Sequence, residues 1–136
     1  IKLPPIKIMG YSWGGNTTMK FAKKLNRKYP EVKIAKVFTV DPVRKGLGVT
    51  RNLFSSKDSK YFIKESNTGE HYNIYQKTDT SSMLVGIKGN FVEEADKNVN
   101  YVSIQNEFSA SYAHIALPES MHAKSLMKQF MSVSGD

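Results

Sequence analysis

The sequence contains no cysteine, which excludes disulfide bonds, thiolate metal sites and thiol nucleophiles. It also has no run approaching the roughly 18 consecutive apolar residues that indicate a membrane-spanning helix, so no transmembrane segment is expected. Hydrophobic residues make up 40% and charged residues 24% of the chain, as in ordinary globular proteins. With 136 residues, the chain forms one domain or part of one, and it is long enough to bury a core.

Acidic residues are scarce in the first half of the chain. Residues 1–68 contain 15 Lys and Arg against 4 Asp and Glu, a net charge of +11, whereas residues 69–136 contain 5 Lys against 8 acidic residues, a net charge of −3. A basic half can attract an anionic membrane surface, nucleic acid or an acidic substrate, and a solubilising lysine-rich surface explains it equally well. No helix-turn-helix, RNA-recognition or zinc-finger pattern is present, so we do not expect nucleic-acid binding.

Hydrophobic patterning predicts an α/β fold with a parallel sheet of about four strands. Short apolar or β-branched stretches that stop at Gly, Asp-Pro or polar residues indicate strands. The strand–helix–strand order of the first 42 residues indicates a parallel βαβ unit. The expected strands are 6–9, 36–40, 71–76 and 99–105, the expected helices are 16–28 and 118–133, and a helical turn is expected near 58–64.

The spacing of apolar residues also predicts which positions are buried. We expect the strand at 6–9 to be covered on both faces and both edges, because three of its four residues are apolar. The predicted buried positions in the helices are Thr18, Ala22 and Leu25 in the first, and Ala123, Met127, Phe130 and Met131 in the last.

The segment GYSWGG, residues 10–15, contains a G-x-S-x-G motif between a predicted strand and a predicted helix. A serine in this context sits on a tight, strained turn that exposes its hydroxyl, so Ser12 is the predicted nucleophile. We expect Gly10 and Gly14 to crowd each other, which leaves no room for a Cβ at either position. The backbone N–H of Trp13, at the start of the helix, is the predicted oxyanion donor.

A serine nucleophile needs a base, and the base needs a carboxylate that orients it. Asp41 ends the next predicted strand, 29 residues after Ser12, and is the favoured acid, with Asp79 as the competitor. In hydrolases with such a turn the histidine follows the acid in the chain. The favoured base is His114, which we expect in a loop over residues 106–117 before the last helix; His122 and His71 are the alternatives.

These segments together resemble the C-terminal half of an α/β-hydrolase of the lipase and esterase kind. IKIMGYSWGG resembles the strand and nucleophile turn of that family, and VFTVDPV resembles its strand followed by the acid. HYNIYQKTD resembles the next strand, and AHIALPES resembles the loop of the histidine. The resemblance spans residues 6–131 and implies that Ser12, Asp41 and His114 are nucleophile, acid and base.

The family has strands before the nucleophile turn, and a loop among them donates the second oxyanion N–H. This sequence contains no candidate for that donor, begins without Met, and its first ten residues do not resemble a secretion signal. We therefore expect residues 1–136 to be the C-terminal half of one catalytic domain, completed by a missing N-terminal segment or by a partner chain.

The resemblance implies a serine hydrolase that cleaves a carboxylic ester of a lipid or another acyl compound. The basic first half of the chain would suit an anionic membrane surface. A secreted esterase or a bacterial effector would be consistent with these features. Without Cys, His-x-His or HExxH spacing, no metal or cofactor is expected. The alternative is a binding or interaction module that derives from a hydrolase and has lost catalysis.

Overall fold

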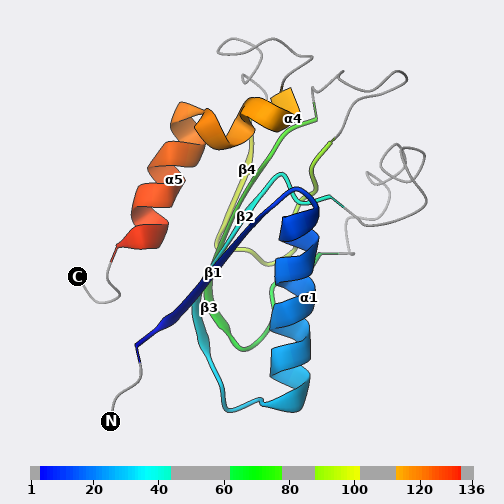
Figure 1. Cartoon of the computed structure of the whole chain (residues 1–136), viewed down its shortest axis with the longest axis vertical. Helices are drawn as coiled ribbons and strands as arrows, with labels where there is room; N and C mark the ends of the chain where they lie inside the picture. The colour runs from blue at the N-terminus through cyan, green and yellow to red at the C-terminus, as the bar shows by residue number, and fades with distance from the viewer. Residues whose placement is uncertain (1–3, 44–61, 78–87, 102–112, 133–136) are drawn as a thin grey trace.

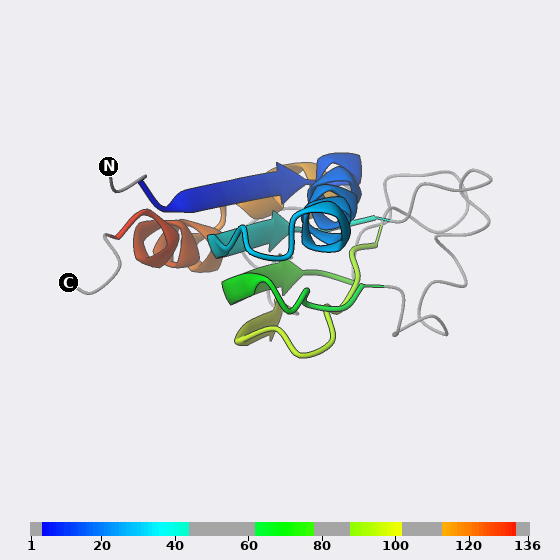
Figure 2. The ribbon, with the colours of Figure 1, turned by 90° about the horizontal axis from the view of Figure 1, so that it is seen from below.

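The computed structural model describes residues 4–43, 62–77, 88–101 and 113–132, which form an α/β fold (Figure 1). A sheet lies between helix α1 on one face and helices α4 and α5 on the other (Figures 1 and 2). The elements in chain order are β1 (Ile6–Tyr11), α1 (Trp13–Lys28), β2 (Ile34–Val40), β3 (Thr68–Tyr75), β4 (Lys97–Asn100), α4 (Ala113–Ala116), the 3-10 turn η3 (Leu117–Glu119) and α5 (Met121–Met131).

The four described strands lie in the order β1-β2-β3-β4, and all neighbours are parallel. The register pairs Met9 with Phe38 and Phe38 with Tyr72. In a parallel sheet the carboxyl ends of all strands lie on the same side. The Ser12 turn after β1 and Asp41 after β2 therefore lie together at the carboxyl ends of the strands. The prediction of a parallel four-stranded sheet in an α/β fold is confirmed.

Both faces of β2 are covered, which explains its nearly continuous apolar run. Phe38 and Val40 pack with Ile74 of β3 against α5, whereas Val37 packs with Ala22 of α1 on the other face. Successive side chains of a strand point to opposite faces, so a strand between two helical layers needs apolar residues at consecutive positions.

Helix α1 begins at Trp13, three residues earlier than predicted. Glycines are poor helix formers, so the pair Gly14-Gly15 disfavours an earlier start of the helix. In the structure they form the first turn of the helix, where Gly15 packs closely on Pro42: a Cβ on Gly15 would lie 2.8 Å from the Pro42 Cβ. Thr18 and Ala22 are buried as predicted, and Leu25 is partly buried.

The C-terminal region differs from the prediction in its boundaries. His114 lies in the short helix α4 rather than in a loop, and Pro118 lies in η3 rather than at the start of the last helix. Helix α5 starts at Met121, because the Ser120 side chain accepts a hydrogen bond from the Ala123 N–H and caps the helix there. The buried positions of α5 are Ala123, Leu126 and Phe130; Met127 is partly buried and Met131 is exposed.

Two lysines from the sheet hold the C-terminal end of α5. Lys36 of β2 is buried, and its Nζ donates to the Gln129 carbonyl at 2.9 Å and to the Ser132 Oγ at 3.0 Å. Lys7 of β1 donates to the Ser132 carbonyl at 2.5 Å. Cations at this end satisfy carbonyls that have no partner within the helix and complement its dipole. This contact helps fix α5, and with it α4, over the sheet.

Two of the remaining strands are shifted, and part of the predicted turn is not described. Strand β3 begins at Thr68, three residues before the predicted start, and β4 covers Lys97–Asn100, while residues 102–105 of the predicted strand lie outside the described residues. The helical turn predicted near 58–64 falls mostly outside them too. Within the described part of that segment, Ile63 forms a parallel bridge with Glu93 instead.

Strand β1 lies at one edge of the described sheet. Its hydrogen-bonded neighbour is β2, and within the described part of the chain its other edge is unpaired. Met9 and Ile6 are exposed, so the expectation that this strand is buried on all sides is wrong for the described residues. No described helix has the length and apolar character that crossing a bilayer requires.

Candidate active site

Ser12 is the single residue between the end of β1 and the start of α1. Its φ of 57° lies in the left-handed region, which a residue with a side chain adopts only under constraint. The Ser12 N–H donates to the Val40 carbonyl at 3.0 Å, and this bond ties the turn to the end of β2. The strained turn predicted for the nucleophile is therefore present.

The two glycines that flank Ser12 are not equivalent. A Cβ on Gly10 would lie 2.2 Å from the Gly14 carbonyl oxygen, so this position admits only glycine. A Cβ on Gly14 would meet no atom within 4 Å, so the prediction that Gly14 must lack a side chain is wrong. A side chain at position 10 would therefore clash with the Gly14 carbonyl, whereas a side chain at position 14 would not clash with Gly10.

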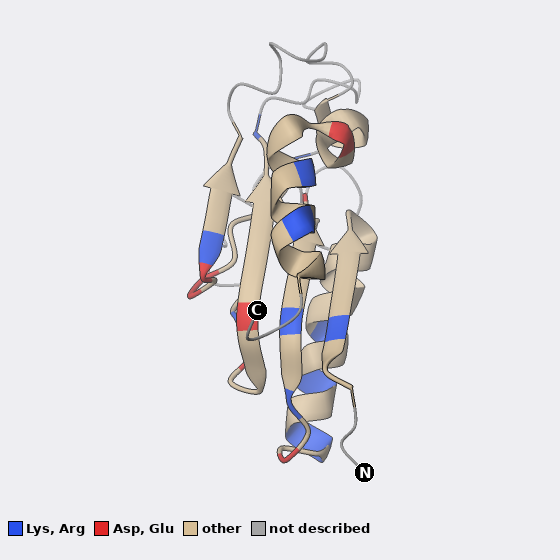
Figure 3. Cartoon of the chain, turned by 90° about the vertical axis from the view of Figure 1, so that its left-hand side faces the viewer, with Lys and Arg blue, Asp and Glu red and all other residues tan. Residues whose placement is uncertain are grey.

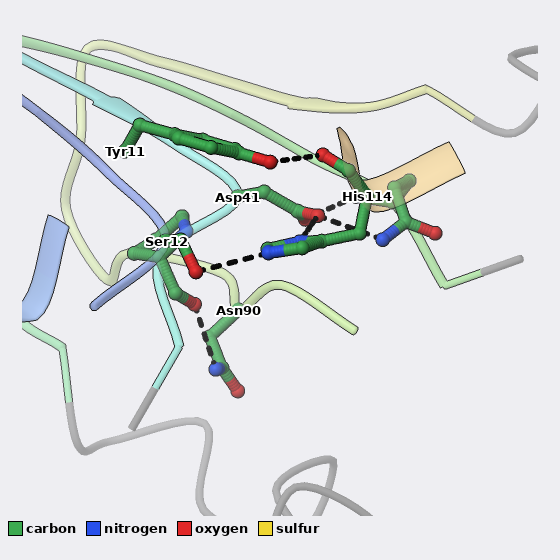
Figure 4. A network of polar contacts seen from close by, with 7 residues as sticks. Tyr11, Ser12, Asp41, Asn90 and His114 are labelled. Carbon is green, nitrogen blue, oxygen red and sulfur yellow. Dashed lines mark hydrogen bonds and ion pairs between the residues drawn. The ribbon is translucent and has the colours of Figure 1, made fainter. Parts of the chain in front are cut away.

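The structure brings together the three residues that the sequence favoured (Figure 4). The Ser12 Oγ lies 2.9 Å from the His114 Nε2, and the His114 Nδ1 lies 2.5 Å from the Asp41 Oδ2. With the proton on Nδ1 donated to the carboxylate, Nε2 is left to accept the hydroxyl proton of Ser12. This is the hydrogen-bond pattern of a serine nucleophile, its base and the orienting acid.

Asp41 is completely buried, directly after β2, and its N–H donates to the Ile74 carbonyl of β3 at 2.7 Å. Burial raises the pKa of Asp41 above its ordinary value, and hydrogen bonds from His114 and Gln76 oppose that rise. The competitor Asp79 lies outside the described residues.

Gln76 is a residue of this site that the sequence reading did not single out. It follows β3 directly and is completely buried. Its N–H donates to the Asp41 Oδ1 at 3.1 Å, and its Nε2 donates to the Asp41 Oδ2 at 2.7 Å. Gln76 and His114 thus bind the same carboxylate oxygen, Oδ2. The sequence contained one signal for this contact: Gln76 directly follows β3, as Asp41 directly follows the neighbouring strand β2.

Gly89 closes the other side of this carboxylate. A Cβ at Gly89 would lie 1.9 Å from the Asp41 Oδ1, and the Gly89 N–H donates to the Gln76 carbonyl at 3.1 Å. Asn90, the next residue, donates from Nδ2 to the Pro42 carbonyl at 2.9 Å (Figure 4). The segment 89–90 therefore holds both Asp41 and the residue that follows it.

Replacing Gln76 with methionine is expected to lower kcat/KM for an ester by about 10- to 100-fold, the effect of losing a hydrogen bond to a charged group. Without this donor the buried carboxylate holds a proton more tightly, so the acidic limb of the pH profile should move to higher pH. Among the described residues, Lys77 also interacts electrostatically with Asp41, and Lys88 interacts with Lys77; neither lysine is altered by the change.

The matched control for this variant is Thr39→Val. It removes the buried hydrogen bonds that the Thr39 hydroxyl forms with Asn73 and His71 in the same sheet, and the described contacts join none of these residues to Asp41. We expect the control to lower the melting temperature without moving the pH profile. A Gln76→Met profile that coincides with that of the unmodified protein would contradict the positioning role of Gln76.

Tyr11, the residue before Ser12, is also in contact with His114. Its hydroxyl donates to the His114 carbonyl at 2.6 Å, and the two rings are stacked with centroids 5.2 Å apart (Figure 4). The variable position before the serine of the motif therefore holds the backbone and the ring of the histidine in place. The sequence placed Tyr11 in the motif but gave no reason to connect it with residue 114.

The other two histidines lie in different surroundings. His71 is buried in β3, where its Nε2 lies 2.9 Å from the Thr39 Oγ1, and burial lowers its pKa to about 4. His122 is exposed in α5, and its ring meets the ring of Tyr101 edge-on. The described contacts join neither of them to Ser12.

The backbone N–H of Trp13 is the first of helix α1, so it belongs to the N–H groups that have no partner within the helix. It lies at the positive end of the helix dipole, directly after Ser12, which is the place that the predicted role of an oxyanion donor requires. Among the described residues, no group of three or more His, Asp and Glu side chains is arranged to hold a metal ion.

The geometry of Ser12, His114 and Asp41 is thus established by the structure itself, with Gln76, Gly89 and Tyr11 around it. No protein-family model matches the sequence, and searches of the curated proteins and of the solved structures find no match.

Proposed function

We propose that this protein is a serine hydrolase that cleaves a carboxylic ester, as lipases and esterases of the α/β-hydrolase family do. The observation that carries this proposal is the continuous chain from the Ser12 Oγ through the His114 imidazole to the Asp41 carboxylate, with contacts of 2.9 and 2.5 Å. A buried carboxylate, an imidazole and a serine on a strained turn are the parts that nucleophilic acyl transfer needs.

In the proposed reaction the Ser12 Oγ attacks the ester carbonyl carbon while the His114 Nε2 accepts its proton. The Trp13 N–H binds the oxyanion that forms, and Asp41 stabilises the positive imidazolium. His114 then gives the proton to the alcohol that leaves, and an acyl-enzyme on Ser12 remains. A water molecule, deprotonated by His114, hydrolyses this ester and restores the serine.

An apolar acyl substrate is supported by the side chains next to the nucleophile and the base. Trp13, directly after Ser12, is 63% exposed, and Ile115, directly after His114, is 65% exposed. Large apolar side chains at the surface favour contact with an apolar ligand or interface. We therefore propose an acyl ester, such as a lipid ester, as the substrate class.

Labelling with a fluorophosphonate probe tests the proposal, because such a probe reacts only with an activated serine. We expect one label per chain, lost in the Ser12→Ala variant and retained in a Ser66→Ala variant, which changes an exposed serine bonded to Asn26. Absence of labelling in the unmodified protein would favour the non-catalytic binding module instead.

We further propose that another strand, from a longer form of this polypeptide or from a partner chain, pairs with the outer edge of β1 and supplies the second oxyanion N–H. The outer edge of β1, which no other described strand pairs with, and the exposed Met9 support this, because an apolar edge strand promotes association. Residues 1–136 alone should therefore self-associate in sedimentation experiments. Their ester turnover should be lower by about 10²- to 10³-fold than that of the completed protein.

Addition of the missing strand should restore solubility and turnover together. A monomer of residues 1–136 with full lipase-like turnover would contradict this proposal about the edge. It would leave the assignment of Ser12, His114 and Asp41 intact.

A further inference from the structure

The solvent face of α1 carries a concentration of positive charge. The helix contains no Asp or Glu, and its charged residues are all exposed cations. An α-helix turns by about 100° per residue, which places all of these cations except Lys23, together with Trp13 and Phe21, on the side opposite the buried Ala22 and Met19. Lys23 lies at the margin of that side. The cations are Lys20, Lys23, Lys24, Arg27 and Lys28. We call this surface the α1 outer face.

The cations of the α1 outer face lack acidic partners at salt-bridge distance within the described part of the chain. None of its five cations forms a salt bridge with a described residue, whereas Lys64 pairs with Asp96 and Lys124 with Glu119 elsewhere. Figure 3 shows Lys and Arg on α1 with the acidic positions on other elements. Like charges three and four residues apart on a helix repel one another. An anionic partner would relieve that repulsion.

The same face also exposes aromatic side chains. Phe21 is 49% and Tyr29, directly after the helix, is 44% exposed. Together with Lys24, Leu25 and Lys28 they line a shallow hollow of about 270 Å³. The Lys28 Nζ lies 5.3 Å from the centre of the Tyr29 ring. Aromatic rings beside lysines suit the headgroup region of a bilayer, where an apolar body and a charged end are both accommodated.

We propose that the α1 outer face docks on an anionic phospholipid surface, with its cations against the headgroups and Phe21 and Tyr29 entering the interface. A cluster of four or more Lys and Arg on one helix face is the pattern that anionic lipids attract. The exposed rings of Phe21 and Tyr29 lie among these cations along a helix about 24 Å long, and this mixture of apolar and cationic side chains favours a lipid interface as the partner.

The position of Trp13 connects this surface to the active site. It lies on the α1 outer face and is the residue directly after Ser12. Docking would therefore hold Ser12 close to the interface. The advantage of this for a lipid ester rests on the proposed function, whereas docking itself does not depend on it.

Co-sedimentation of the full chain with vesicles tests the docking surface. We expect binding to phosphatidylcholine vesicles that contain phosphatidylserine, little binding to pure phosphatidylcholine, and weaker binding as salt is raised. The triple variant K20Q/K24Q/K28Q should bind about 100-fold more weakly, since each cation near such a surface contributes about fivefold. Phe21→Ala should weaken binding without changing its dependence on salt.

The control is K97Q/K124Q/K128Q, which removes the same charge from exposed lysines of β4 and α5. We expect this variant to retain most of its vesicle binding. Equal loss in both triple variants, or no binding of the unmodified protein to anionic vesicles, would overturn the proposal. Displacement of the protein from vesicles by stoichiometric single-stranded RNA would assign the face to nucleic acid and would also overturn it.

Fluorophosphonate labelling separates this outcome from the proposed function. The K20Q/K24Q/K28Q variant should be labelled in solution at the same rate as the unmodified protein, because none of the three lysines touches Ser12, His114 or Asp41. Lost vesicle binding with retained labelling supports the docking surface. Labelling without any vesicle binding in the unmodified protein overturns the surface alone.

Discussion

Ser12→Ala is expected to abolish ester hydrolysis, with a loss in kcat on the order of 10⁶. The Ser12 Oγ is the atom that contacts the His114 Nε2, and alanine has no hydroxyl to replace it. The fold should persist, because the bonds that hold the turn run from the backbone of Ser12 to Val40 and Val43. Alanine tolerates the positive φ no worse than serine does.

Turnover of a p-nitrophenyl ester by the purified protein measures this effect. Circular dichroism should show that the variant keeps the secondary structure of the unmodified protein, and Ser66→Ala should keep full turnover. Unchanged turnover by Ser12→Ala would eliminate Ser12 as the nucleophile.

His114→Ala is expected to cost nearly as much, because a serine without its base is a poor nucleophile and the members of such a unit act together. The imidazole is in contact with both Ser12 and Asp41, at 2.9 and 2.5 Å. His122→Ala should retain activity, since that side chain is exposed and meets Tyr101. All three histidine variants are compared in the same ester assay.

His71→Ala distinguishes stability from catalysis. His71 is buried and bonded to Thr39, so its loss should lower the melting temperature while the folded fraction keeps its turnover. If His122→Ala were inactive and His114→Ala active, the arrangement of α4 and α5 over the sheet would be wrong.

The strained turn at Ser12 and the sheet could be predicted from local sequence, because both depend on neighbouring residues. A glycine at position 10 is required by the Gly14 carbonyl four residues later, and the apolar run of β2 reflects two covered faces. The choice among acids and histidines needed the order of elements as well. That order placed Asp41 at the end of β2 and His114 before the last helix, and the structure brings both to Ser12.

Element boundaries were predicted less well, because they depend on contacts distant in the chain. Glycines disfavour a helix, yet Gly14 and Gly15 lie in the first turn of α1, where Gly15 packs closely on Pro42. In α5, the Ser120 cap moved the helix start past Pro118, so Met131 lies on the exposed side. The intrinsic helix propensity of single residues is weak, so such contacts determine where a helix begins.

The sequence by itself determined the parallel α/β fold, the strained serine turn and the identity of the three residues joined there. Those features follow from side-chain period, from the absence of a Cβ at Gly10 and from chain order. Only the tertiary structure decided which groups surround them: Gln76 and Gly89 against the Asp41 carboxylate, and Tyr11 against His114. Gln76 lies 35 residues from Asp41, and Tyr11 lies 103 residues from His114. No local pattern records such contacts, because the pairing of parallel strands and the docking of α4 and α5 create them.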